Sequence, residues 1–290
     1  MAATIGIVAA EGIFAAVVQN HRIVGPLRLA TDAEDLLSLP AEDLAEKLCE
    51  IILETAESVS AIGLAVPGLV TPDGIIAECP HLPQLKGFRL ADAIRSRLHV
   101  DVAVSEVADA FAAGIAASRG HLDRLSRVWT LGESVGYGRY PSGSEYWEGG
   151  HTVVTLDPHD TYCSCGGAGH LEGILGMRAM RLRFLDLEPD EILVSRESRC
   201  TEFVKMWNRA LAAATASSLH TEGPGKFYLT GPGSRFVQMG LLYRYIDEMV
   251  TMSTLQDYVF KIIPECHELA IVGATVGIAS GVVVSAAASA

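Results

Sequence analysis

Two histidines and two cysteines in one stretch of the chain have the residue types and spacing of a metal site. His151 is followed, after eleven intervening residues, by Cys163, Cys165 and His170. Thiolate sulfur and imidazole nitrogen are the ligands that zinc prefers, and four protein ligands complete a tetrahedral structural site without an open position. The alternative interpretation is two free thiols and two unrelated histidines in a loop, and His159 in the same loop is a competing ligand.

Two acidic side chains flank this candidate site. Glu148 precedes His151 by three residues, and Glu172 follows His170 by two. Carboxylates and a neutral imidazole can accept protons from hydroxyl groups, so this set suits a polyol. The alternative for both carboxylates is a capped loop or a helix N-terminus, where the helix dipole would stabilise a negative charge.

Strands that alternate with helices must position these residues, and this alternation indicates an α/β fold class. The helices are predicted from apolar residues at helical spacing, and the strands from short apolar runs bounded by turn residues. We expect strands at 4–9, 13–18, 22–29, 61–66, 100–104, 127–131, 152–156, 226–230, 258–263 and 270–272. We expect helices at 41–58, 88–98, 108–118, 171–184, 200–219 and from the Gly-Pro-Gly turn at 231–233 to about 249.

Composition and charge bound the class of protein. The chain has 290 residues, of which 49% are hydrophobic and 20% charged, as in a globular protein with a sizeable core. The net charge of −13 argues against a broad nucleic-acid-binding face, which needs clustered Lys and Arg. No basic segment precedes the first apolar stretch, and the cysteines are few, so we expect a cytoplasmic location in a reducing compartment.

The C-terminal segment 269–290 contains no charged residue and is long enough to span a bilayer. It is rich in Gly, Ala and Ser, and no basic residues flank it. A buried strand followed by a helix is therefore favoured over a membrane anchor, and we expect no membrane partner.

The metal-site stretch resembles the signature of the ROK family, which comprises sugar kinases and sugar-responsive repressors. That signature is Glu-x-Gly-His, a gap, then Cys-x-Cys-Gly-x-x-Gly-Cys-x-Glu, and His170 replaces the third cysteine with another zinc-binding residue. Other segments are similar to family motifs in family order. They are the Gly-Ile-Pro-Gly loop at 63–68, the Pro-Asn-Leu-Pro segment at 79–83, the second phosphate loop at 131–138, the adenosine-side glycine motif at 230–234 and the Gly-Ala pair at 273–274.

The resemblance implies a two-domain, actin-like (ribonuclease-H-like) sugar-kinase fold with a structural zinc ion and a sugar in the cleft between the domains. We expect a smaller N-terminal domain over 1–110, a larger domain with the zinc loop over 111–274, and a helix at about 275–290 that packs back on the first. Family members commonly self-associate, so a dimer is expected. No helix-turn-helix segment precedes Met1, so we expect the chain to fall outside the repressor branch.

The resemblance also implies which residues contact a ligand. These positions are Gly68, His81, Glu106, Glu148, His151 and Glu172. His81 and Glu106 each stand where the family has an asparagine, which implies a changed ligand.

Three segments depart from the family's kinase motifs. Val8–Gly12 replaces Asp-x-Gly-Gly-Thr and includes Glu11, and Gly-Glu-Ser with Glu133 replaces Gly-Thr-Gly. Val107 stands where the resemblance implies the aspartate that acts as general base, and a valine cannot accept a proton. A carboxylate in each phosphate loop repels phosphate, so binding of ATP and magnesium is not expected.

Three functional hypotheses follow. The first is a degenerate ROK protein that binds a sugar-like or cyclitol-like polyol without ATP-dependent kinase activity, either as a binder or in chemistry that does not use ATP. The second is an active sugar kinase in which Asp109 or Glu106 serves as a relocated base. The third is an interaction protein that binds no small ligand.

Overall fold

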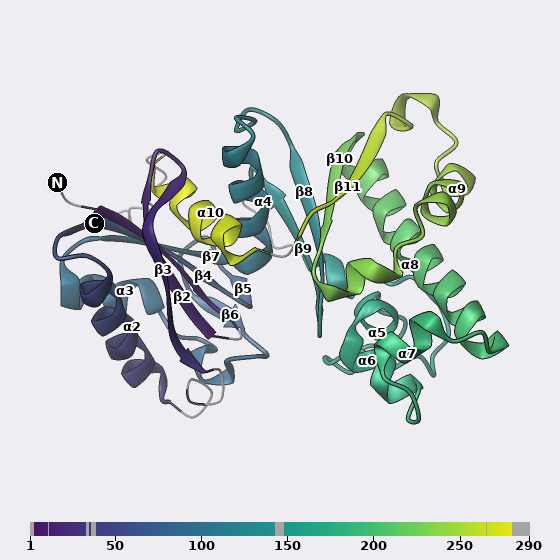
Figure 1. The fold of residues 1–290 in the computed structure, drawn as a ribbon, viewed down its shortest axis with the longest axis horizontal. Helices are drawn as coiled ribbons and strands as arrows, with labels where there is room; N and C mark the ends of the chain where they lie inside the picture. The colour runs from purple at the N-terminus through teal and green to yellow at the C-terminus, as the bar shows by residue number, and fades with distance from the viewer. Residues whose placement is uncertain are drawn as a thin grey trace, which may run out of the picture. The chain divides into compact units, whose positions relative to one another are not determined.

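The computed structural model describes residues 3–10, 12–32, 35, 39–142, 148–264 and 266–279 (Figure 1). The chain divides into two compact units. Unit 1 comprises Met1–Ser126, Gly138–Tyr146 and Cys266–Ala290, and unit 2 comprises Arg127–Tyr137 and Trp147–Glu265. Each unit combines a sheet with helices, so the predicted α/β class is confirmed.

The sheet of unit 1 has five strands in the order β3-β2-β1-β4-β7. They are β1 (Ala3–Ala9), β2 (Gly12–Gln19), β3 (Arg22–Asp32), β4 (Val59–Val66) and β7 (Asp101–Glu106). The first three strands in sequence pair antiparallel, whereas β1, β4 and β7 run parallel. A short hairpin of β5 (Leu69–Val70) and β6 (Ile76–Glu78) and the turn η1 (Pro83–Leu85) follow β4.

Alternation along the central strands gives the two faces of this sheet different partners. Ile5 and Ile7 lie in one hydrophobic core with the apolar side of α2 (Ala41–Thr55) and with α3 (Leu90–Leu98). Gly6, between them, lies against α10 (His267–Ala279), because a Cβ there would be 2.2 Å from the Ile271 carbonyl oxygen. Helices therefore cover both faces.

The C-terminal helix α10 packs at backbone distance on its neighbours. A Cβ at Gly273 would lie 1.7 Å from the carbonyl oxygen of Ala110, in α4 (Val107–Ser118), and one at Gly63 would lie 2.2 Å from that of Ala274. The predicted strand at 270–272 is wrong, because these residues are helical. Within the described ranges, none of the helices combines the length and apolar character needed to cross a bilayer.

Unit 2 contains most of a four-stranded sheet in the order β11-β10-β8-β9, of which Ser126 and the end of β9 from Gly138 fall in unit 1. Its strands are β8 (Ser126–Leu131), β9 (Val135–Tyr140), β10 (Gly225–Thr230) and β11 (Tyr258–Ile262). Its helices are α5 (Glu172–Leu175), α6 (Met177–Arg183), α7 (Pro189–Val194), α8 (Ser198–Glu222) and α9 (Met239–Met249), with 3-10 turns η2 (Gly149–His151), η3 (Pro232–Phe236) and η4 (Ser253–Leu255). Trp129, Trp207 and Phe227 are fully buried in its core.

The structure of this unit differs from the sequence predictions at three places. Residues 152–156 form no strand, and only an isolated bridge at Val153 remains. The strand β9 was not predicted, since its glycines and tyrosines lack an apolar run. The helix predicted over 171–184 breaks at Gly176, whose extended backbone ends α5 and begins α6.

Candidate metal centre and the residues around it

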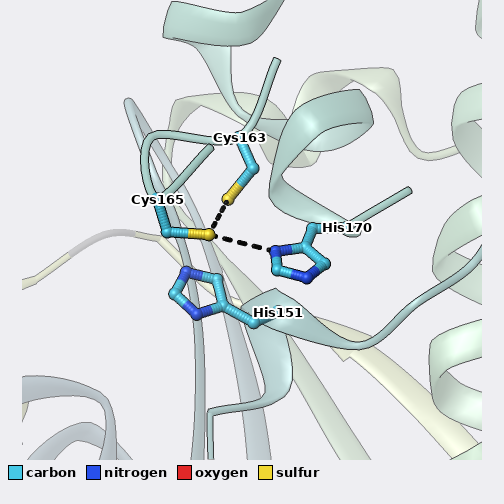
Figure 2. A group of neighbouring side chains, drawn as sticks. All are labelled: His151, Cys163, Cys165 and His170. Atoms are coloured by element: carbon cyan, nitrogen blue, oxygen red, sulfur yellow. Dashed lines mark hydrogen bonds between the residues drawn. The ribbon is translucent and has the colours of Figure 1, made fainter. Parts of the chain in front are cut away.

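Four side chains of unit 2 bring their ligand atoms together (Figure 2). One atom each from His151, Cys163, Cys165 and His170 lies within 4.8 Å of the others. The Cys165 sulfur is 3.4 Å from the Cys163 sulfur and 3.2 Å from Nδ1 of His170. The two imidazole rings stack with centroids 5.2 Å apart. All four residues predicted as ligands are therefore together, and His159 is not part of this group.

Main-chain pairing closes the loop around these atoms. An isolated antiparallel bridge joins Val153 to His170, so the chain after η2 lies beside the last ligand. Gly169 donates its N–H to the Asp160 carbonyl at 2.7 Å and has a φ of +72°. A Cβ at this position would lie 2.0 Å from the Thr155 carbonyl oxygen. Glycine is required here, since both the left-handed backbone and the close approach exclude a side chain.

An arginine of α6 holds the base of the loop. The Arg183 guanidinium donates from Nη2 to the buried Asp160 carboxylate and from Nε to the Gly173 carbonyl at 2.8 Å. It also stacks on the Tyr162 ring, with 4.2 Å between the guanidinium carbon and the ring centroid. Removal of either partner would leave a largely buried charge without its counterion and lower the stability of the protein. The pair therefore holds the loop against α6.

The donor set fits a zinc ion. Two sulfurs and two imidazole nitrogens form a typical closed tetrahedral set. Burial, and then the nearby His151, lower the pKa of His170, which favours the neutral imidazole that binds metals. Burial raises the pKa of the Cys163 thiol to about 12, so the metal must displace a proton to bind there.

Glu172 is buried, with 6% of its surface exposed, and both of its carboxylate oxygens have partners. Oε1 accepts hydrogen bonds from the N–H and hydroxyl of Ser164, at 3.0 and 2.5 Å, and lies 3.4 Å from the Cys163 sulfur. Oε2 accepts from the Val135 N–H at 3.4 Å. Burial acts to raise the pKa of Glu172, but these hydrogen bonds outweigh burial and lower it.

Glu148, the other predicted carboxylate, immediately precedes η2 and is exposed. The pKa of Glu148 is raised, and the largest cause is partial desolvation of its carboxylate by neighbouring protein atoms. The residue as a whole is still exposed. The His151 charge opposes this shift and the Glu172 charge adds to it. Glu148 is therefore exposed to solvent, whereas Glu172 is buried.

In unit 1, the segments of two predicted ligand contacts lie against each other. A Cβ at Gly68 would lie 2.2 Å from the Glu78 carbonyl oxygen, and the Cys79 thiol donates to the Pro67 carbonyl at 3.4 Å. The loop after β4 therefore packs on the chain just before His81. The His81 side chain is exposed.

The predicted catalytic segment lies where β7 runs into α4. Glu106 is the last residue of the strand and is half-buried, and Val107 is the first residue of the helix. Asp109, in the first turn, accepts a hydrogen bond through Oδ1 from the Arg139 backbone N–H at 2.9 Å. One oxygen of the candidate relocated base is thus engaged in a main-chain contact.

The loop between β8 and β9 is tied to α6. Both oxygens of Glu133 accept hydrogen bonds from Nη1 of Arg181, at 2.7 and 3.0 Å, and Arg181 also donates to Glu188 at 2.9 Å. The Gly132 carbonyl accepts from the Met177 N–H at 3.0 Å. Because Arg181 is shared by Glu133 and Glu188, it offsets part of the Glu133 charge, and the repulsion of phosphate expected from the sequence is weaker than a lone carboxylate would produce.

The other acidic residue expected to repel phosphate, Glu11, lies outside the described residues.

The arginines of α6 have contacts that we did not predict from the sequence. Arg181 and Arg183 bind carboxylates 48 and 23 residues away, and no spacing rule relates such partners. The only indication in the sequence was composition, because this seven-residue helix carries three arginines in an acidic chain, which suggests nearby carboxylate partners.

Comparison with known proteins assigns the family. Residues 14–283 match the ROK family. A xylose repressor of Caldicellulosiruptor bescii is 27% identical over 164 residues, which are 53% of this chain and 40% of the repressor. The match therefore spans less than half the length of that relative.

Solved structures with the same fold include a ROK hexokinase from Thermus thermophilus. It is 20% identical with a TM-score of 0.74, and the alignment covers 93% of this chain and 96% of the hexokinase. A ROK family glucokinase from Streptomyces griseus, in complex with glucose and AMPPNP, is 19% identical with a TM-score of 0.65 over 94% of this chain and 97% of the glucokinase. The predicted actin-like sugar-kinase fold is confirmed, and because the family match covers most of the sequence, the chain belongs to the ROK family, which includes sugar kinases and sugar-responsive repressors.

Proposed function

We propose that this ROK-family chain binds a sugar-like or cyclitol-like polyol without ATP-dependent kinase activity, and that a structural zinc ion holds the loop between His151 and His170. The observation that carries the proposal is the start of α4. Val107 lacks a proton acceptor, and the nearest acidic residue within the helix, Asp109, already accepts a main-chain hydrogen bond.

The loss of a general base alone lowers the rate by about 10²–10⁴-fold, because a sugar hydroxyl is a poor nucleophile while it keeps its proton. Phosphoryl transfer depends further on groups that position the phosphates and neutralise their charge. Glu133 stands in the second phosphate loop with its carboxylate on Arg181. Arg181 is therefore engaged with Glu133, and its positive charge is less available to bind an incoming phosphate.

Zinc would be held by the four residues of the candidate centre. A closed site of this kind contributes folding energy and leaves no position for a substrate. His151 and Cys163 come from either end of a loop whose middle contains no regular strand or helix. The metal would therefore supply the stability that this loop does not obtain from secondary structure.

The ligand contacts that we propose are Gly68, His81, Glu106, Glu148, His151 and Glu172. Exposed Glu148 supplies a hydrogen-bond acceptor for a ligand hydroxyl, and the exposed His81 ring can donate or accept. Glu172 accepts hydrogen bonds within the protein, but a carboxylate can accept about four, and its Oε2 has one bond at 3.4 Å. Both carboxylates therefore stay in the proposed contact set, with Glu148 the more exposed of the two.

A second candidate function, an active kinase with a relocated base, has one observation in its favour. Arg181 offsets part of the Glu133 charge, so the second phosphate loop repels a phosphate less than the sequence predicts. This function would require Asp109 or Glu106 as the base and a different phosphate cradle.

Isothermal titration with ATP–Mg, and separately with glucose, mannose, their N-acetyl forms and myo-inositol, tests the proposal. Binding of a polyol without ATP is the expected result. Binding of both ligands would favour the active kinase, and binding of neither would favour an interaction protein. Light scattering on the same sample measures whether the chain forms the dimer that we also propose.

A further inference from the structure

The carboxylate of Glu172 connects three parts of unit 2. Its Oε1 accepts both donors of Ser164, the residue between the two cysteine ligands, and its Oε2 accepts from Val135 at the start of β9. The side chain is 6% exposed, so these bonds are made largely away from water. Hydrogen bonds to a charged acceptor are stronger than those between neutral groups, so these contacts hold the carboxylate in place.

Glu172 also lies close to one of the candidate metal ligands. Its Oε1 is 3.4 Å from the Cys163 sulfur, and the same oxygen accepts both donors of Ser164, the next residue. The Val135 N–H binds the other oxygen. Three donors from Ser164 and Val135 therefore anchor the carboxylate at both oxygens beside the Cys-Ser-Cys turn.

We propose that Glu172 is a positioning residue for the metal centre, which fixes the Cys-Ser-Cys turn by linking Ser164 to β9 through its two carboxylate oxygens. The inference rests on the proposed zinc site. Partners of metal ligands orient those ligands, and their removal typically lowers metal affinity by about 10–100-fold. The buried negative charge also stabilises the cation, because the low-dielectric surroundings weaken its screening.

Glu172→Gln keeps the size of the side chain but offers an N–H₂ group to one of the three donors. Asp157→Asn is the matched control, since exposed Asp157 in the same loop also accepts a backbone N–H, that of His159 at 2.9 Å. Ser164→Ala removes the hydroxyl donor and keeps the N–H. The zinc dissociation constant is measured by competition with a chromogenic chelator, and cobalt absorption reports the ligand geometry.

The expected result is that zinc binding weakens about 10–100-fold in Glu172→Gln, with a changed cobalt spectrum, and stays within about twofold in Asp157→Asn. The double variant of Glu172 and Ser164 should weaken binding by less than the product of the single effects, because both act through one contact. Without metal, Glu172→Gln should melt at a lower temperature than wild type, because buried donors lose a charged acceptor, but it should stay folded at the assay temperature. Zinc affinity is then compared between two folded proteins, which separates positioning from a general loss of folding.

Equal zinc affinity in wild type and Glu172→Gln would overturn the inference while leaving the zinc site intact. A loss of the same size in Asp157→Asn would overturn it as well, because the effect would then belong to any charge in the loop. Wild-type protein that binds no zinc would instead refute the proposed metal site itself.

Discussion

Replacement of Gly169 by alanine should disrupt the metal centre, and replacement of Gly166 in the same loop should not. Both glycines have positive φ, +72° and +79°, so an alanine at either position bears the same left-handed backbone cost of about 1–2 kcal/mol. The two positions differ in space. A Cβ at Gly166 has no neighbour within 4 Å, whereas one at Gly169 would lie 2.0 Å from the Thr155 carbonyl oxygen.

The size of the required movement predicts the loss of metal binding. Real Cβ contacts are essentially never shorter than 3.0 Å, so the chain at Gly169 or Thr155 must move from a contact of 2.0 Å to at least that distance. Zinc sites tolerate changes of only about 0.2 Å in ligand distance. His170, the next residue, therefore cannot keep its place without strain.

We expect Gly169→Ala to destabilise the zinc-loaded protein by about 1–3 kcal/mol more than Gly166→Ala, the usual cost of an overpacked site. Zinc affinity should fall at least about tenfold in Gly169→Ala, which corresponds to about 1.4 kcal/mol, and stay near wild type in Gly166→Ala. Denaturant titration and chelator competition measure the two quantities. Equal stability and equal zinc affinity in the two variants would refute the reasoning.

Four further outcomes are expected. Cys163→Ala should retain less than about half an equivalent of zinc by elemental analysis and melt at a lower temperature, because binding energy at a structural site is folding energy; full zinc content would contradict the site. Gly273→Ala should lower the free energy of unfolding by more than about 3 kcal/mol in a denaturant titration, since its Cβ would lie 1.7 Å from a main-chain oxygen of α4. Gly277→Ala, whose Cβ has no neighbour within 4 Å, should raise the free energy of unfolding by about 0.5–1 kcal/mol. Millimolar ATP–Mg should leave the melting temperature of the wild type unchanged, and a clear increase would favour the active kinase. In a coupled assay of ADP release, wild type and Val107→Asp should both be inactive toward glucose and mannose; turnover by wild type that Asp109→Ala abolishes would identify a relocated base.

The metal ligands and the fold class could be predicted because both depend on local patterns. His151, Cys163, Cys165 and His170 form a motif that can be read without knowing any distant contact, and the structure brings them together. Alternating apolar runs likewise indicated strands and helices, although the glycine-rich β9 was missed. Residues 270–272 were predicted as a strand because a short apolar run fits either element.

Only the tertiary structure decided what the charged and apolar groups contact. The helical state of α10 follows from packing of its backbone on Gly6 and Gly63, contacts more than 200 residues apart that no periodicity encodes. The same holds for Arg181 on Glu133 and for Glu172 on Ser164, where each carboxylate binds donors that the fold brings near it. The sequence therefore determined which residues can ligate a metal, and the fold determined which donors each carboxylate meets, because these partners come from segments far apart in the chain.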